Sequence, residues 1–346
     1  MEWEGPGPWG VPLRGALDQV VVESVALAPN RLRDPSRRPL LVYTPPGYAV
    51  EPERRYASLY VLQGMTGQVD MWRNRTALRP TMIERVDQLF SDPGVPPCLV
   101  VFVDCWTSLG GSQFLDSPAT GQYHTYLCDE VVALVDSRYR TLAHPDHRGI
   151  TGHSSGGYGA MVSSLLRPDL FGGVATHAGD ACFELCYLPE FPHVVRALRT
   201  EHDGSYQRFF QDFRARPAFS RPTDGVLLNA WCMAACYSAD LDGTVRLPFD
   251  LATGRLDEEV WGRWLAWDPV RLVARRAEAA AGLRAVYIDA GTRDEYFLDC
   301  GAQAYRDALR AVGQERVVFQ LFEGGHGGSD HRYPLGLRHL AERLAP

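Results

Sequence analysis

A serine between two glycines is the strongest chemical signal in this chain, with Gly152, Ser154 and Gly156 at alternate positions. In this pattern the serine sits on a sharp turn from a strand into a helix, where its hydroxyl is exposed and can act as a nucleophile. Glycines are needed there because side chains would clash in so tight a turn. The alternative is an ordinary glycine-rich turn that cradles a phosphate, but phosphate motifs place their glycines differently.

A serine hydroxyl needs a base, usually a histidine that an acid holds in place, and both follow the serine along the chain in this type of fold. His326 lies among glycines in residues 324–328, just after the last predicted strand. This loop is suited to carry an imidazole to Ser154, so we predict His326 as the base. His331, five residues further on, is the alternative base.

The acid is expected in a loop that follows a late strand. Asp294 lies just beyond the predicted strand 283–289 and is our candidate, with Asp180 as the alternative. We expect the neighbouring Glu295 to point elsewhere and Asp289 to cap the loop. A turn or helix-capping aspartate is the structural alternative for Asp294.

Acyl transfer to a serine also needs two backbone N–H groups that bind the oxyanion. One belongs to the residue after the nucleophile, which is Ser155. The other comes from the loop after the third strand, residues 64–67, where we predict Met65 and keep Thr66 as an equal alternative.

The elements that must position these residues alternate between buried strands and helices. Strands are predicted at 19–27, 39–44, 57–63, 98–103, 148–151, 171–179, 283–289 and 316–322, and helices at 79–90, 123–137, 158–166, 299–312 and 333–344. The first two strands can pair as an antiparallel hairpin, and the rest predict a mostly parallel sheet with helices on both faces. We therefore expect one α/β domain that spans residues 1–346.

Residues 180–270 interrupt this alternation after the sixth predicted strand. The segment is rich in aromatic residues and has no clear strand. An insertion at the carboxyl edge of the sheet predicts a lid or cap over an apolar group of a substrate. A helical decoration with its own small core is the equal alternative.

Composition excludes several classes of function. The net charge of the 346 residues is −7 and no basic cluster is present, which argues against nucleic acid as a partner. The first residues lack the charged and apolar regions of a signal peptide, and no apolar stretch approaches the roughly 18 residues of a membrane span. We expect a cytoplasmic protein without membrane contact.

The sequence has eight cysteines, which in a reducing compartment default to free thiols. Two pairs are each four residues apart, Cys182 with Cys186 and Cys232 with Cys236. Four thiolates can hold zinc, but the usual zinc spacing is two intervening residues, and the usual glycines are missing. We expect no metal and no other cofactor.

Five short stretches carry a family resemblance, in the order that the family has them: residues 44–48, 62–67, 152–157, 289–294 and 323–326. With them the chain resembles the putative-esterase branch of the α/β-hydrolases, which includes S-formylglutathione hydrolases (esterase D), enterochelin esterases, feruloyl esterases and mycolyltransferases. The resemblance spans about residues 20–345. It implies Ser154 as nucleophile, Asp294 as acid, His326 as base, and the amides of Met65 and Ser155 as oxyanion donors. Residues 180–270 depart from it, because most members carry a shorter segment there.

The residues and the resemblance together predict a serine hydrolase that cleaves carboxylic esters through an acyl-enzyme on Ser154. Its partner is expected to be a small-molecule ester, and a homo-oligomer is left open. One alternative is an acyltransferase that uses the same three residues and passes the acyl group to an alcohol. The other is a non-catalytic binding protein on a hydrolase scaffold.

Overall fold

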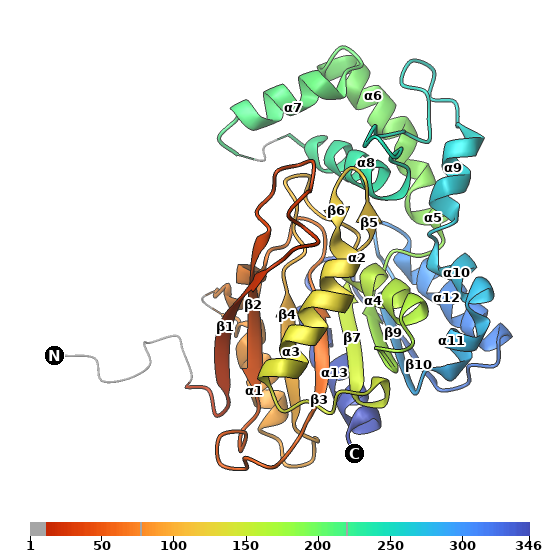
Figure 1. The fold of residues 1–346 in the computed structure, drawn as a ribbon. Helices are drawn as coiled ribbons and strands as arrows, with labels where there is room; N and C mark the ends of the chain where they lie inside the picture. Colours follow the sequence, from red (N-terminus) through yellow and green to blue (C-terminus); the bar gives the residue numbers. More distant parts are fainter. Residues whose placement is uncertain (1–11, 77, 219–220) are drawn as a thin grey trace.

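A sheet of eight strands forms the centre of the molecule (Figure 1). The computed structural model describes residues 12–76, 78–218 and 221–346. The strands lie in the order β1-β2-β4-β3-β7-β8-β9-β10; β2 is antiparallel to both of its neighbours and all other pairs are parallel. Their bounds are β1 Ala16–Glu23, β2 Arg37–Thr44, β3 Ala57–Leu62, β4 Cys98–Val103, β7 Arg148–His153, β8 Gly173–His177, β9 Ala285–Gly291 and β10 Val317–Phe322. The predicted α/β class, with a mostly parallel sheet, is confirmed.

The central strands are apolar throughout because both faces of the sheet are covered. In β3, Leu59 and Val61 belong to one hydrophobic cluster and Tyr60 and Leu62 to another, as the alternation of side chains along a strand requires. Helices α1 and α13 cover the first face, and α3, α4 and α12 cover the second. The bounds of these helices are α1 Met82–Phe90, α3 Val132–Arg138, α4 Ser155–Leu166, α12 Leu298–Ala311 and α13 Tyr333–Leu344.

Most predicted elements lie within three residues of their expected bounds, and two differ more. The strand expected at 19–27 is β1, which ends at Glu23 because the N–H groups of Val25 and Ala26 donate to Glu130 instead of to a neighbouring strand. The helix expected at 123–137 is a short α2 (Tyr123–Thr125), a π-helical segment (Tyr126–Val131) and then α3. A small two-stranded sheet, β5 (Asp116–Ser117) with β6 (Gly121–Gln122), directly precedes this helix. In the described ranges, none of the helices is both long and apolar enough to cross a membrane.

Helices fill the chain between β8 and β9. They are α5 Phe183–Cys186, a 3-10 turn at Leu188–Glu190, α6 Phe191–Glu201, α7 Tyr206–Ala215, α8 Asp224–Tyr237, α9 Glu258–Leu265, α10 Pro269–Arg275 and α11 Ala277–Gly282. Figure 1 shows α6, α7 and α8 grouped at one end of the sheet, near β5 and β6. Most aromatic residues of this segment pack on one another: Trp264 contacts the rings of Tyr187, Phe191 and Tyr237 and is fully buried. They belong to the same hydrophobic cluster as one face of the sheet.

Candidate active site

Ser154 occupies a strained turn between β7 and α4. Its φ of 57° and ψ of −129° lie outside the regions that residues with a side chain usually adopt. A Cβ atom on Gly152 would collide with the backbone of Gly156, and one on Gly156 would collide with the carbonyl oxygen of Leu62. The two glycines are therefore required by the close approach of three backbone segments, and they fix the position of the Ser154 hydroxyl.

The structure brings Ser154, His326 and Asp294 together in one hydrogen-bonded chain. Nε2 of His326 lies 3.0 Å from Oγ of Ser154, and its Nδ1 lies 2.8 Å from Oδ2 of Asp294. The three residues follow β7, β9 and β10 at the carboxyl edge of the parallel strands. With Nδ1–H donating to Asp294, Nε2 is left as the acceptor for the Ser154 hydroxyl proton.

Electrostatics favour proton uptake by His326. Burial lowers the pKa of His326, but the hydrogen bond and charge of Asp294, with the charges of Asp180 and Glu295, outweigh it and raise the pKa above its ordinary value. The side chain of Asp294 is fully buried, so its interaction with the imidazole is little screened by water. The site can therefore stabilise the imidazolium that forms when Ser154 gives up its proton.

Two further residues hold the backbone of His326, and sequence reasoning missed both. Oε2 of Glu295 accepts a hydrogen bond of 2.8 Å from the N–H of His326, so the expectation that Glu295 points elsewhere is wrong. Nε2–H of His153 donates to the carbonyl oxygen of His326 at 3.0 Å, and the two rings lie 4.5 Å apart. Burial, with repulsion from His326 and His177, lowers the pKa of His153 to about 3, which keeps this ring neutral. The sequence held one signal for their role: Glu295 directly follows Asp294, and His153 directly precedes Ser154.

The predicted oxyanion donors lie beside Ser154. The N–H of Ser155 is in the first turn of α4, where no carbonyl of the same helix can accept it. Met65 follows β3 and lines the same pocket as Ser154. The alternative, Thr66, has a φ of 65° and donates its N–H to the carbonyl of Gly110 at 2.7 Å, so that amide is already engaged. Met65 stays the predicted second donor.

The other candidate acids and bases have different partners. His331 is exposed, and its Nδ1 lies 3.2 Å from the carbonyl of Gly328. Asp180 is buried; its Oδ2 accepts hydrogen bonds from Tyr187 Oη at 2.7 Å, Gln113 Nε2 at 3.2 Å and Ser155 Oγ at 3.3 Å. Burial raises the pKa of Asp180, against the lowering effect of these hydrogen bonds. Asp180 therefore lies next to the site without bonding the imidazole.

Asp289 supports the turn from inside the sheet, rather than capping a loop as expected. Its carboxylate lies 2.8 Å from Nδ1 of His177 and accepts from Nε of Arg332 at 2.9 Å. The carbonyl of His177 in turn accepts the N–H of Ser154 at 3.0 Å.

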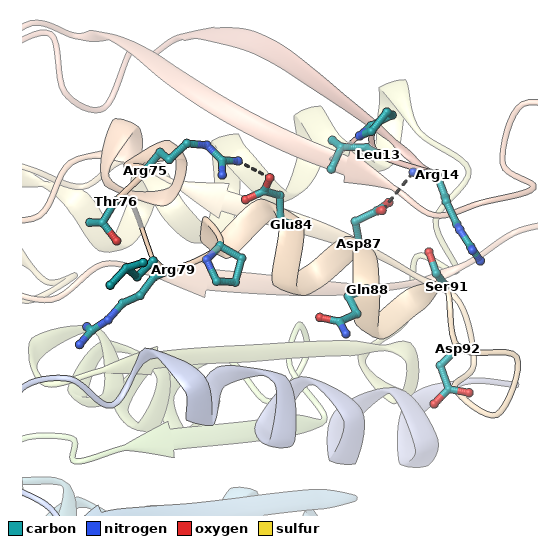
Figure 2. A pocket seen from close by; sticks show the side chains of 13 residues that line it. Leu13, Arg14, Arg75, Thr76, Arg79, Glu84, Asp87, Gln88, Ser91 and Asp92 are labelled. Carbon is teal, nitrogen blue, oxygen red and sulfur yellow. Dashed lines mark hydrogen bonds and ion pairs between the residues drawn. The ribbon is translucent and has the colours of Figure 1, made fainter. Parts of the chain in front are cut away.

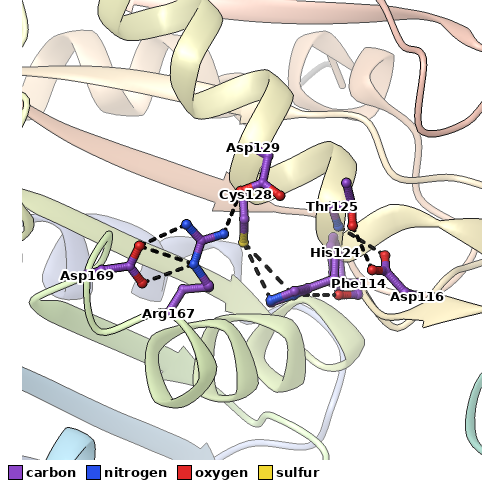
Figure 3. A network of polar contacts seen from close by, with 8 residues as sticks. All are labelled: Phe114, Asp116, His124, Thr125, Cys128, Asp129, Arg167 and Asp169. Atoms are coloured by element: carbon purple, nitrogen blue, oxygen red, sulfur yellow. Dashed lines mark hydrogen bonds and ion pairs between the residues drawn. The ribbon is translucent and has the colours of Figure 1, made fainter.

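His124 belongs to a separate network (Figure 3), where its ring contacts Cys128 Sγ at 3.7 Å.

A pocket of about 570 Å³ opens above Ser154 and His326. From the chain between β8 and β9 its lining includes Asp180, Cys186, Tyr187, Glu190, Pro222, Gly225, Val226, Leu228 and Asn229; from elsewhere it includes Gly64, Met65, Thr66, Met71, Tyr296, Leu298, Asp330 and Tyr333. Of the described aromatic residues in 180–270, only Tyr187 reaches this pocket. Sequence analysis left two equal alternatives for these aromatic residues, a cover over the substrate or a core of their own, and most of their side chains belong to the hydrophobic core.

A larger pocket, about 760 Å³, lies beside α1 and the start of β1 (Figure 2). Its polar groups serve the fold: Asp87 accepts the N–H groups of Arg14 and Gly15 at 3.0 and 2.8 Å, and Arg75 pairs with Glu84. Among the described residues of its lining, Ser91 is the only serine and none is a histidine. This pocket therefore offers no counterpart to the chemistry at Ser154.

The two cysteine pairs do not suit a metal. All eight cysteines are free, and burial raises the pKa values of Cys186 and Cys236 well above the ordinary range, which disfavours the thiolate that binds a metal. Over the part of the chain that the structure describes, no three His, Cys, Asp or Glu side chains are grouped to hold a metal ion.

Comparison with known proteins identifies, over most of the chain, the family that the sequence motifs resemble. Residues 35–342 match the model of the family described as putative esterase. Similar solved structures include a ferulic acid esterase, with a TM-score of 0.60 and 17% identity over 96% of this chain and 100% of that one. An S-formylglutathione hydrolase from Agrobacterium tumefaciens has a TM-score of 0.57 and 17% identity over 98% and 99%. A feruloyl esterase module from Clostridium thermocellum, complexed with sinapinate, has a TM-score of 0.58 and 13% identity over 95% and 89%.

Proposed function

The chain belongs to the putative esterase family and is a serine hydrolase of carboxylic esters, and we propose that it works through Ser154, His326 and Asp294. The observation that carries this proposal is the unbroken hydrogen-bonded chain from Ser154 Oγ through the imidazole to Asp294, at 3.0 and 2.8 Å. A hydroxyl, a base and a buried acid in this geometry are the parts that acyl transfer to serine requires.

The reaction follows from these positions. Ser154 Oγ attacks the carbonyl carbon of the ester while Nε2 of His326 takes its proton, and the amides of Met65 and Ser155 bind the oxyanion. The tetrahedral intermediate collapses, the imidazolium protonates the leaving alcohol, and an acyl-enzyme remains on Ser154. His326 then removes a proton from water as that water attacks the acyl carbon. The acid leaves and the proton returns to Ser154.

The surroundings of the site support three further parts of the proposal. We propose one hydrolase domain in which residues 180–270 form a cap, because side chains from α5 and the start of α8 line the pocket. The pocket volume of about 570 Å³ suits a small-molecule ester, and neither nucleic acid nor membrane is a proposed partner. We place the protein in the cytoplasm because its eight thiols are unpaired, as a reducing compartment favours.

Covalent labelling tests the role of Ser154. A fluorophosphonate should label the wild type once, at Ser154, and Ser154→Ala should abolish both labelling and hydrolysis of p-nitrophenyl acetate. Ser155→Ala is the matched control, because it keeps the backbone amide and should still be labelled. A wild type that hydrolyses the ester but is not labelled, or a labelled Ser154→Ala variant, would contradict the proposal.

A further inference from the structure

We infer that Asp180 determines substrate specificity: its unused carboxylate oxygen binds an O–H or N–H group of the ester, so that donor-bearing esters are preferred over carboxylate-bearing ones. This inference rests on the proposed function at Ser154. It goes beyond the three reacting residues and names the chemical class of the substrate.

The hydrogen bonds of Asp180 use one of its two oxygens. Tyr187, Gln113 and Ser155 all direct their donors to Oδ2, at 2.7, 3.2 and 3.3 Å. No described residue donates to Oδ1, although the residue is only 6% exposed and lines the pocket. A carboxylate oxygen that is withdrawn from bulk water and lacks a donor gains strongly from a ligand that supplies one.

Asp180 is close to the reacting atoms. It lies three residues beyond the end of β8, the strand that pairs with β7 and its nucleophile turn. Its carboxylate contacts the side chain of Ser155, which directly follows Ser154. A donor on a short acyl or alkoxy group therefore reaches Oδ1 while the ester carbonyl lies at Ser154.

The charge of the pocket favours the same class of substrate. Asp180, Glu190 and Asp330 line it, and over the described residues no lysine or arginine does. An ester that carries a carboxylate would meet three acidic side chains and no lysine or arginine among the described lining residues. Among the described residues of 180–270, Tyr187 is the one aromatic residue in the lining. Its hydroxyl already donates to Asp180.

The wild type tests this preference with two sets of matched esters. On the alcohol side these are 2-hydroxyethyl acetate, propyl acetate and carboxymethyl acetate. On the acyl side they are methyl 3-hydroxypropanoate, methyl butanoate and monomethyl malonate. Values of kcat/KM, each divided by the rate constant for hydroxide hydrolysis, should favour the hydroxyl ester over its methyl analogue about 10-fold or more on one side. The carboxylate ester should be the poorest of that set. Equal values for hydroxyl and methyl esters on both sides would overturn the inference.

Asp180→Asn tests the residue itself. The amide keeps an oxygen for the three donors and presents NH₂ to the pocket in place of the acceptor. The preference for hydroxyl over methyl esters should disappear, and the discrimination against carboxylates should shrink at least 10-fold. Glu190→Gln removes a charge from the same pocket without touching Oδ1, so it should weaken only the discrimination against carboxylates. An Asp180→Asn variant with the wild-type hydroxyl preference would refute the inference.

Two readouts separate failure of this inference from failure of the proposed function. If Ser154 is labelled and the acetates are hydrolysed without any preference, only the role of Asp180 is wrong. If no ester is hydrolysed and Ser154 is not labelled, the proposed function fails first. If circular dichroism shows that Asp180→Asn does not fold, the ester sets measured on the wild type still decide whether the preference for hydroxyl esters exists.

Discussion

Glu295 accepts a hydrogen bond from the backbone N–H of His326 at 2.8 Å, and thereby holds the loop whose imidazole contacts Ser154. This hydrogen bond lowers the pKa of Glu295, which favours its charged form. On the other side of the same residue, His153 donates to the His326 carbonyl. The backbone N–H and carbonyl of His326 are therefore both held by side chains, and its ring is held by Asp294.

Loss of the Glu295 carboxylate should impair positioning rather than chemistry. Glu295→Ala is expected to lower kcat about 10- to 100-fold with a small change in KM. The reason is that a displaced imidazole is less often within hydrogen-bond distance of the Ser154 hydroxyl in the bound complex. Glu295→Gln keeps an acceptor oxygen and should recover most of the loss. Steady-state kinetics on p-nitrophenyl acetate measure both, and a Glu295→Ala enzyme with wild-type kcat would show that the loop is held by other contacts.

His153 offers a second test of the same loop. His153→Phe preserves a ring against His326 but removes the donor, so kcat should fall about fivefold, the equivalent of about 1 kcal/mol for one hydrogen bond. Because His153 is neutral over the working range, the pH dependence of the variant should match that of the wild type. A shifted pH profile would mean that His153 exchanges protons in the reaction.

The raised pKa of His326 sets the direction of the pH dependence. The imidazole must be neutral to accept the Ser154 proton, so kcat/KM should fall as pH drops through a midpoint above the ordinary histidine value of about 6.5. Asp294→Asn removes the largest raising influence and should move the midpoint down, with kcat lowered about 10⁴-fold. Profiles of kcat/KM between about pH 5 and 9 measure the shift. A midpoint that stays unchanged in Asp294→Asn would contradict the assigned acid.

Gly152 should be irreplaceable for structural reasons. In Gly152→Ala the new Cβ meets backbone atoms of Gly156, which cannot move aside as a flexible side chain would. We expect a loss of about 4 kcal/mol or more in the free energy of unfolding. Gly262→Ala in α9 is the control, because a Cβ there meets nothing within 4 Å and should stabilise the helix by about 0.5–1 kcal/mol. Urea denaturation compares the two, and a Gly152→Ala protein as stable as the control would disprove the steric argument.

Local sequence signals were enough for much of the fold. Cys98–Val103 is a buried strand with the predicted bounds because its six residues are all apolar. Tyr333–Leu344 is a helix with its predicted bounds, starting with proline in its first turn. The arrangement of Ser154, Asp294 and His326 at one edge also follows from local signals, because parallel strands place their carboxyl ends together.

Contacts between distant residues account for what was missed. Glu295 and His326 are 31 residues apart, and His153 and His326 are 173 apart, so no local pattern links them. The π-helical segment Tyr126–Val131 has apolar residues at helical spacing, and that spacing does not separate it from an α-helix. The aromatic residues of 180–270 were also ambiguous, since buried and pocket-facing rings have the same composition.

The separation between buried rings and pocket lining in the chain from β8 to β9 has a consequence for how this enzyme can change. Phe183 and Trp264 are fully buried, whereas Glu190 and Asn229 line the pocket and remain partly exposed. Mutations at the second group need not disturb the packing of the first. Natural variation, or a library restricted to those two positions, can therefore change the ester preference without altering the packed core on which folding depends.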